Sequence, residues 1–373
     1  MKRLKIIMRN VISWIKKQIA SLSVVVLSFI LVVFLVEVTL RIVVSDDPWI
    51  KTREANILRD VHFKYDISNI YENNSSIVDY VRNKYGLRDS CANPAEIDIL
   101  TIGGSTTDQR YVNFDFTYQS IIERRLKTYF NDFGCVSNAG VDGHSTFGHL
   151  FSFKHWFPLI PNLKPKFIVL YIGINDVNFL RKISLNSGYD TTKERGIKAF
   201  FKKLEVVKAL LPLYRFLKQK TKSDSPIYAN HKFIRYSDDD YVINVINNQT
   251  EFLSKQNTSV FRSRMQSLME HISSLGAIPV CITQPHRYIM KKNGQTYGIP
   301  DVLGKGFSGV DFDYSIRKLN DVMFELCKKN TLDLYNHQFL STHFYDGVHT
   351  TSTGSREIGE RIAEFIISRF LNQ

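Results

Sequence analysis

Two short motifs supply a serine, a histidine and an aspartate of the kinds that together make a serine nucleophile. Ser105 follows two glycines at the end of the apolar run 97–102. A serine hydroxyl is a poor nucleophile at neutral pH and needs an adjacent general base. His349 can act as that base, and Asp346 can accept its other ring N–H and fix the tautomer. The residues therefore predict nucleophilic attack by Ser105.

Each motif taken alone also has an ordinary interpretation. A strand followed by Gly-Gly-Ser fits a phosphate-binding loop or a plain strand-to-helix turn. Asp346 and His349 alone fit a capping aspartate beside a surface histidine. A nucleotide site is disfavoured in detail, because the chain lacks Gly-x-Gly-x-x-Gly here and has no lysine after the glycines.

Two middle motifs supply hydrogen-bond donors at the ends of other predicted strands. Gly140 ends Val-Ser-Asn-Ala-Gly, and Asn175 lies in Gly-Ile-Asn-Asp. Attack on an ester carbonyl develops an oxyanion, and preorganised donors aimed at it lower the barrier. We expect the Ser105 N–H, the Gly140 N–H and the Asn175 side-chain amide to form this oxyanion hole. The alternatives are a turn glycine and a helix cap.

The four motifs, in this order, resemble those of the SGNH hydrolase superfamily, also called the GDSL esterase/lipase family. They are Gly-Gly-Ser (103–105), Asn-Ala-Gly (138–140), Gly-Ile-Asn-Asp (173–176) and Asp-Gly-Val-His (346–349). The resemblance implies that Ser105, Gly140, Asn175 and His349 are the functional residues, with Asp346 as the triad acid. One departure is Gly104, where the family's first block has an aspartate that is not its catalytic acid.

The elements that must position these motifs alternate between strand and helix. We place strands at 97–103, 134–138, 167–174, 278–284 and 331–335, and helices at 116–130, 148–158, 251–275, 313–329 and 353–371. This alternation predicts a parallel sheet with helices on both faces. The resemblance implies the flavodoxin-like three-layer α/β/α sandwich of the SGNH hydrolases, with about five strands, over residues 95–373.

The N-terminus has the pattern of a single-pass membrane anchor. Six lysines and arginines lie in residues 1–17, and residues 18–36 carry no charge. A stretch of about 20 apolar residues spans a bilayer, and flanking basic residues stay in the cytoplasm. We predict a cytoplasmic tail (1–17), a transmembrane anchor (18–44) with Glu37 able to pair with Arg41, and a periplasmic or extracellular remainder. Residues 45–94 are expected to form a membrane-proximal segment that packs irregularly on the catalytic domain.

Two insertions interrupt the predicted catalytic domain, at about 177–250 and 287–311. The first contains a basic amphipathic helix at 193–222, which accounts for part of the net charge of +13. That helix either docks on the core or contacts an anionic membrane or acidic glycan; nucleic acid is disfavoured. The second follows Gln284 and His286, which we consider candidates for substrate contact, although His286 fits a surface histidine better.

The four cysteines show no metal-ligand spacing, so we predict no structural zinc and no metal site. The acyl-enzyme mechanism needs no cofactor, and we expect none. Outside the cytoplasm disulfides are allowed. Cys91 precedes one predicted strand and Cys135 begins the next, which predicts a Cys91–Cys135 bond if these strands are neighbours. Cys281 is expected to be a buried free thiol, and Cys327 has no predicted role.

The sequence leaves three functions open. A serine esterase would resolve its acyl-enzyme with water, whereas an O-acyltransferase would use a sugar hydroxyl. The resemblance to membrane-anchored SGNH proteins implies that the substrates are small acyl groups on a cell-envelope polysaccharide. It also implies that the protein acts either alone or with other proteins that modify this polysaccharide. A non-catalytic, membrane-tethered binding module is the third, but binding alone would not require Ser105, Asn175, Asp346 and His349 together.

Overall fold

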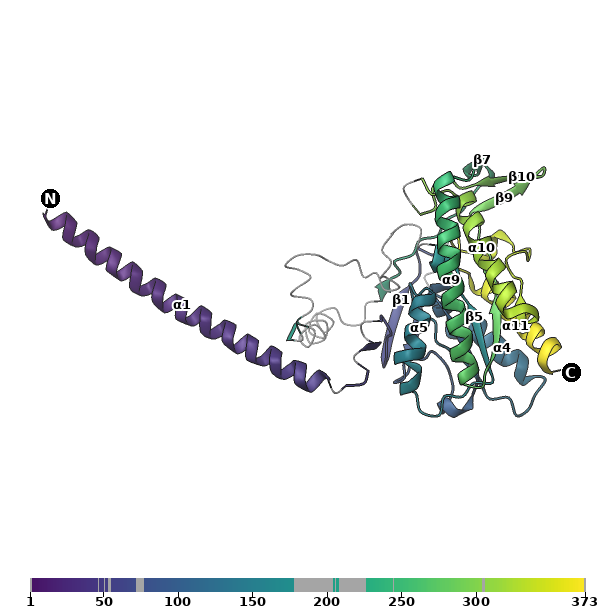
Figure 1. The fold of residues 1–373 in the computed structure, drawn as a ribbon, viewed down its shortest axis with the longest axis horizontal. Helices are drawn as coiled ribbons and strands as arrows, with labels where there is room; N and C mark the ends of the chain where they lie inside the picture. The colour runs from purple at the N-terminus through teal and green to yellow at the C-terminus, as the bar shows by residue number, and fades with distance from the viewer. Residues whose placement is uncertain are drawn as a thin grey trace. The chain divides into compact units, whose positions relative to one another are not determined.

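A computed structural model gives the fold of the chain (Figure 1). It describes residues 2–45, 47–49, 51–52, 55–71, 77–177, 204, 206–207, 226–243, 245–303 and 306–371. The chain divides into two compact units, one formed by 1–50 with 191–224 and the other by 51–190 with 225–373. Most of the predicted basic helix at 193–222 lies outside the described residues.

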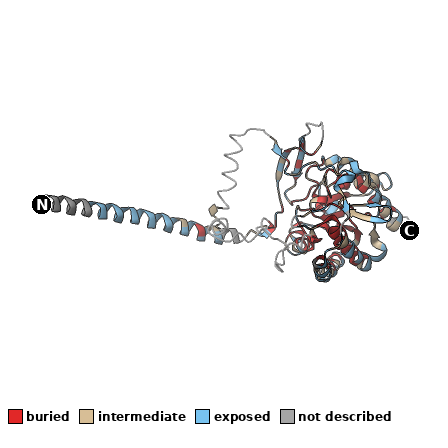
Figure 2. Cartoon of the chain, turned by 90° about the horizontal axis from the view of Figure 1, so that it is seen from above, coloured by how far each residue is buried: buried red, intermediate tan, exposed pale blue. Residues whose placement is uncertain are grey.

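The first unit contains one long apolar helix. Helix α1 (Lys2–Ser45) includes the stretch Trp14–Ile42, which is long and apolar enough to cross a membrane and is not buried inside the protein. Figure 2 shows most of it as exposed. The predicted pair is confirmed, since Arg41 Nε donates to Glu37 Oε1 at 2.8 Å.

The second unit is built around a five-stranded parallel sheet, as predicted. Its strands are β3 (Ile97–Gly103), β4 (Cys135–Asn138), β5 (Phe167–Tyr171), β8 (Ile278–Ile282) and β11 (Thr331–Leu332). Their order in the sheet is β11-β8-β5-β3-β4, and all four pairings are parallel. This is the flavodoxin-like order. The chain first adds β4 on one side of β3 and then adds β5, β8 and β11 on the other side, so the switch point lies between β3 and β5. The crevice for a ligand therefore lies where β3 and β5 end.

Helices cover both faces of the sheet, because alternate strand residues point to opposite faces and both sets are apolar. Ile99, Val169 and Val280 face α4 (Tyr118–Lys127) and α11 (Ser352–Ile366), which pack against each other. On the other side α9 (Asn248–Ser274) packs against α5 (Thr146–His155) and α10 (Gly309–Cys327). These helices begin and end within a few residues of the predicted bounds. The chain then closes with a π-helical turn, Ile367–Leu371.

The prediction of irregular packing for residues 45–94 is wrong. Strands β1 (Val61–Asp66) and β2 (Ile77–Arg82) form an antiparallel pair, and β6 (Ile227–Tyr228) adds to β1 in parallel. The buried side of this sheet carries Tyr65, Val78 and Tyr80. A second small sheet, in the order β7-β10-β9, contains β7 (Val242–Ile243), β9 (Ile289–Lys292) and β10 (Gln295–Gly298), so it joins the ends of both insertions.

Short helices complete the described chain. They are the 3-10 turns Pro94–Glu96, Phe114–Phe116, Phe157–Leu159, Asp238–Asp240, Lys328–Asn330 and Ser341–His343, and the single α-turns α3 (Ser105–Asp108) and α6 (Ile174–Val177). Both α-turns begin directly after a central strand. They bring Ser105 and Asn175 to the same edge of the sheet.

All four cysteines are bonded. Cys91 is joined to Cys135, with Cα atoms 5.8 Å apart, at the end of the sheet where β3 and β4 begin. Cys281 is joined to Cys327, so the expectation of a free thiol at Cys281 is wrong. The place of Cys281 inside an apolar strand indicates burial but not a partner, and the bond joins strand β8 to the C-terminal residue of α10, 46 positions later.

Candidate active site

Ser105, His349 and Asp346 form a continuous chain of hydrogen bonds. The His349 Nε2 atom is 2.8 Å from Ser105 Oγ, and its Nδ1 atom is 2.7 Å from Asp346 Oδ2. The serine and histidine are 244 positions apart in sequence. The His349 and Asp346 side chains are each 15% exposed, and Ser105 is also partly exposed, so the site is mostly covered but open to solvent at the serine. The geometry is that of a nucleophile, its base and the base's orienting acid.

The loop that carries His349 is held by its own aspartate. Asp346 Oδ1 accepts hydrogen bonds from the Val348 and His349 N–H groups, at 2.9 and 2.7 Å. Burial favours the neutral acid, but the charge interaction with His349 and these hydrogen bonds outweigh it and lower the pKa of Asp346. Asp346 is therefore ionised at neutral pH and can stabilise an imidazolium on His349.

Glycines allow the nucleophile turn to pack tightly. A Cβ on Gly103 would lie 2.4 Å from the Tyr171 carbonyl oxygen, and one on Gly104 would lie 2.2 Å from Asn175 Nδ2. The aspartate that the resemblance leads one to expect at position 104 would require the Asn175 side chain to shift. The turn ends at Gln109, whose φ of 47° is left-handed. Gln109 Nε2 then donates to Thr350 Oγ1 at 3.2 Å, which ties the nucleophile turn to the histidine loop.

The three predicted oxyanion donors differ in whether their N–H groups already take part in hydrogen bonds. Asn175 packs against Gly104, and its Nδ2 donates one hydrogen bond to the His144 carbonyl at 2.9 Å. An amide NH₂ has a second hydrogen to give. Among the hydrogen bonds of the described chain, none uses the Ser105 N–H. The Gly140 N–H, in contrast, donates to Asn138 Oδ1 at 2.8 Å, so it is already engaged.

Gln284 and His286 lie in the interior rather than at a substrate surface. Gln284 is 1% exposed; it accepts from the Ile174 N–H at 2.9 Å and donates to Thr106 Oγ1 at 2.7 Å. It thus joins the turn after β5 to the nucleophile turn. The His286 side chain is 1% exposed with Nε2 3.3 Å from Asp313 Oδ1, so the expectation of a surface histidine is wrong. Gln284 therefore stabilises the turns that carry Ser105 and Asn175, whereas His286 packs against α10.

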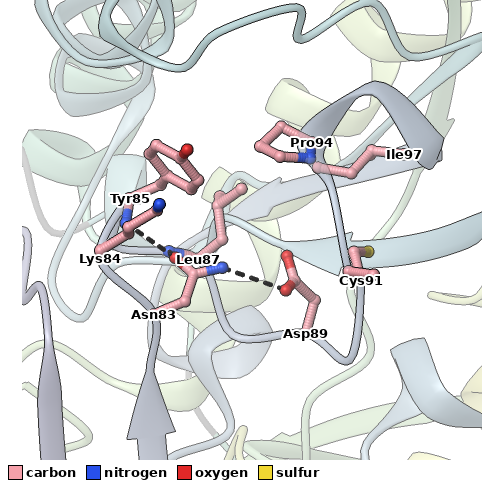
Figure 3. A pocket seen from close by; sticks show the side chains of 9 residues that line it. Asn83, Lys84, Tyr85, Leu87, Asp89, Cys91, Pro94 and Ile97 are labelled. Carbon is pink, nitrogen blue, oxygen red and sulfur yellow. Dashed lines mark hydrogen bonds between the residues drawn. The ribbon is translucent and has the colours of Figure 1, made fainter.

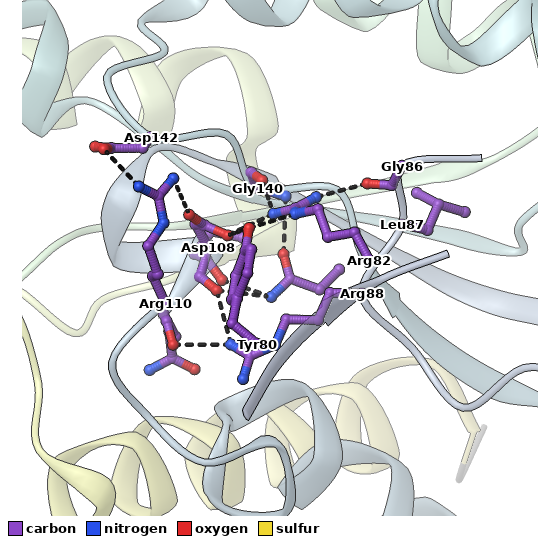
Figure 4. A network of polar contacts seen from close by, with 12 residues as sticks. Tyr80, Arg82, Gly86, Leu87, Arg88, Asp108, Arg110, Gly140 and Asp142 are labelled. Atoms are coloured by element: carbon purple, nitrogen blue, oxygen red, sulfur yellow. Dashed lines mark hydrogen bonds and ion pairs between the residues drawn. The ribbon is translucent and has the colours of Figure 1, made fainter. Parts of the chain in front are cut away.

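A buried network that was not predicted supports the nucleophile turn from behind (Figure 4). Arg82 donates to Asp108 Oδ1 and to the Gly140 carbonyl, each at 2.5 Å. Arg88 donates to the backbone carbonyls of Asp108 and Gln109, at 3.0 and 2.8 Å. Tyr80 donates to Asp108 Oδ1 at 2.6 Å and lies beneath the guanidinium groups. Strand β2 and the turn after it therefore help to hold Ser105 in place.

A second histidine contacts the predicted base and was also missed. The His231 ring lies 4.5 Å from the His349 ring, centroid to centroid, and its Nδ1 is 3.0 Å from Tyr345 Oη. The Tyr345 ring stacks on His349 at 5.6 Å. Burial, followed by the neighbouring His349, lowers the pKa of His231 to about 4, so its imidazole is neutral at pH 7. No motif surrounds His231, so its spacing in sequence gives no signal.

Two hollows lie at opposite ends of the sheet. The one at Ser105 and His349 is small and is further lined by Thr106, Gln109, Tyr111, Val112, Tyr345 and Thr350. The other lies where β3 begins, beside Cys91, Pro94 and Ile97, with Asp89 hydrogen-bonded to Asn83 (Figure 3). It contains none of the predicted catalytic or oxyanion-hole residues. The candidate active site is therefore the small hollow at the carboxyl ends of the strands.

Comparisons with known proteins give distant structural likenesses only. No model of a protein family matches the chain, and no curated protein matches its sequence significantly. The acetyl xylan esterase AlAXEase is 13% identical, with 73% of this chain and 100% of that one covered and a TM-score of 0.39. Axe2, an acetylxylan esterase from Geobacillus stearothermophilus, is 14% identical, with 72% and 93% covered and a TM-score of 0.38.

A putative lipolytic protein of the G-D-S-L family from Desulfitobacterium hafniense DCB-2 is 11% identical. The match covers 72% of this chain and 98% of that one, with a TM-score of 0.35. Likenesses with scores this low assign no activity to the chain. The strand order and the distances around Ser105 carry the functional interpretation.

Proposed function

We propose that the protein is a serine esterase that acts through an acyl-enzyme. The single observation that carries this proposal is the hydrogen-bonded chain from Ser105 through His349 to Asp346. These three hydrogen-bonded residues lie where the central strands end, which is the edge at which open α/β sheets bind ligands. A binding module would not need a serine aligned with a base that is itself oriented by an ionised carboxylate.

In the proposed reaction His349 Nε2 takes the Ser105 proton as Oγ attacks an ester carbonyl. Asp346 stabilises the resulting imidazolium, and the Ser105 N–H and the second Asn175 amide hydrogen donate to the oxyanion. The imidazolium then protonates the leaving alcohol, which leaves an acyl group on Ser105. Water, deprotonated by His349, attacks this acyl group and restores the free serine. Gly140 contributes a donor only by sharing its N–H with Asn138.

The proposed substrates are O-acyl groups of a glycan outside the cytoplasm. Helix α1 supports this location, because it is long and apolar enough to anchor the chain and is preceded by basic residues. The small hollow at Ser105 supports a short acyl group. If a sugar hydroxyl replaces water in the second step, the same site performs O-acyl transfer, as the sequence also allowed.

The test is fluorophosphonate labelling of the full-length protein in detergent, with the modified peptide identified by mass spectrometry. We expect a label on Ser105 that is lost in Ser105→Ala and strongly reduced in His349→Ala. Ser90→Ala, at an exposed serine, is the matched control and should label normally. Release of acetate from an acetylated oligosaccharide, with and without a free oligosaccharide acceptor, then separates hydrolysis from transfer. Folded protein that takes no label at Ser105 would refute the proposal.

A further inference from the structure

His231, Asp346 and His349 form a cluster of side chains of the kinds that bind zinc. One ligand atom from each lies within 4.8 Å of the other two, and each of the three residues is partly exposed. Imidazole nitrogen and carboxylate oxygen are common zinc ligands, with bonds of about 2.0–2.2 Å. Tetrahedral bonds of that length bring ligand atoms to about 3.5 Å from each other. Side-chain movements of about an ångström would therefore suffice to close the cluster around an ion.

The surroundings of His231 suit a metal ligand. Its Nδ1 is 3.0 Å from Tyr345 Oη, and a phenol oxygen can accept a hydrogen bond. With the proton on Nδ1, the Nε2 lone pair is free to bind a metal. Ligating histidines almost always donate their other ring N–H to such a partner, which fixes the tautomer. The ring is also held on its edge by Tyr111, at 5.0 Å between centroids.

A metal ion bound to this cluster would disrupt the hydrogen bonds of the catalytic residues. Both nitrogens of His349 are already used, Nδ1 with Asp346 and Nε2 with Ser105. If the ion binds Nδ1, the nitrogen gives up its proton and the bond to Asp346 is lost. If the ion binds Nε2, the lone pair that accepts the Ser105 proton is occupied. In both cases the base can no longer activate the serine.

We propose that His231, His349 and Asp346 form an inhibitory zinc site that switches the enzyme off when zinc binds. The inference rests on the proposed function, since inhibition presupposes catalysis by Ser105. His231 supplies the extra ligand that a triad alone lacks. It comes from the last part of the first insertion, which is held in place by the pairing of β6 with β1. Zinc must enter from solvent, which the partial exposure of all three side chains permits.

The experiment titrates ZnCl₂ into the full-length protein and measures two quantities. One is the rate of ester hydrolysis relative to the same variant in EDTA, and the other is zinc binding by competition with a chromogenic chelator. We expect reversible inhibition in the unmodified protein. In His231→Gln the zinc concentration for half inhibition should rise at least about tenfold, because loss of even a supporting residue costs 10–100-fold in metal affinity. Comparing each variant with itself removes any change in its basal rate.

The matched control is His62→Gln, at an exposed histidine whose Nε2 is 2.6 Å from Asp79. It removes a histidine beside a carboxylate but should leave both readouts unchanged. Equal inhibition of His231→Gln and unmodified protein, or no inhibition at millimolar zinc, would overturn the zinc site. Failure of the proposed function gives a different result: zinc binding would still depend on His231 while Ser105 takes no fluorophosphonate.

Discussion

Arg82 donates a hydrogen bond from Nη2 to Asp108 Oδ1 at 2.5 Å, and both side chains are only 2% exposed. Asp108 is three residues after the predicted nucleophile, whereas Arg82 belongs to strand β2, outside the predicted catalytic domain. Burial opposes the charge on Asp108, but Arg82 and Arg110 outweigh it and lower the pKa of that carboxyl. The pair therefore makes the fold of the catalytic core depend on the hairpin of β1 and β2.

Arg82→Met should destabilise the protein by about 3 kcal/mol or more. Removing one partner of a buried ion pair typically costs 3–5 kcal/mol. We expect the lower end of this range, because Arg110 still pairs with Asp108 Oδ2 at 3.2 Å and compensates part of its charge. The variant also loses the hydrogen bond to the Gly140 carbonyl. The measurement is urea unfolding of the full-length protein in detergent, followed by the fluorescence of buried Trp156. Arg125→Met, which breaks an exposed pair with Glu360, should change the stability little. Equal effects of the two substitutions would contradict this account.

Gly104→Ala should lower kcat for ester hydrolysis by about 100-fold while the protein stays folded. The added Cβ would lie 2.2 Å from Asn175 Nδ2, so the amide must move away from the oxyanion. Removing one such donor typically costs 10²–10³ in kcat. The measurement is steady-state hydrolysis of a short-chain p-nitrophenyl ester.

A double-mutant cycle gives the Gly104 prediction its control. If the alanine acts by displacing the amide, Asn175→Ala should produce a similar loss, and the double variant should be hardly worse than either single one. Losses that multiply would show that Gly104→Ala damages the nucleophile turn by another route.

The features that could be predicted are those that leave a pattern in the local sequence. The parallel sheet follows from apolar strands alternating with helices, and the gathering of Ser105, Asn175 and His349 follows because parallel strands end at one edge. The network behind Ser105 could not be found in this way. In β2 the residues alternate in burial, but exposed positions carry Ile77 and Val81 whereas a buried one carries Arg82. Alternating hydropathy, the usual strand signal, is therefore absent.

His231 escaped prediction for a related reason. It lies in an irregular stretch within the first insertion, 118 residues before His349, and nothing in its neighbourhood resembles a motif. Its place beside the base depends on pairing with distant segments: the Ala229 N–H donates to the Asp66 carbonyl, and the Ile234 N–H donates to the Tyr345 carbonyl. Contacts of this kind become visible only in three dimensions.

Two disulfides should be found without reduction, as linked peptides joining Cys91 to Cys135 and Cys281 to Cys327. Closing a loop across 44 positions is worth about 4 kcal/mol in the chain-entropy account, so Cys91→Ser should destabilise the protein by up to that amount. Mild reduction should open Cys91–Cys135 first, because Cys91 is partly exposed and the other pair is buried. Alkylation followed by mass spectrometry checks the pairing and the order, and other pairings would contradict the structure.

Asp176 should make the stability of the protein fall as the pH rises through about 6. The carboxyl is buried and accepts hydrogen bonds from the Thr146 N–H and Oγ, and burial raises its pKa to about 6 despite those bonds. A carboxyl with a raised pKa in the folded state favours folding fully below its unfolded pKa, near 3.8, and loses that contribution above the folded value.

Asp176→Asn removes this dependence while keeping an oxygen that can accept from Thr146. One pKa unit corresponds to 1.36 kcal/mol, so the unmodified protein should lose about 1 kcal/mol more than the variant between pH 5 and pH 7.5. Urea unfolding at the two pH values measures the four free energies, and all other groups cancel in the difference between the proteins. Parallel pH dependences would mean that Asp176 is ionised throughout, because its hydrogen bonds to Thr146 then outweigh the cost of burying the charge.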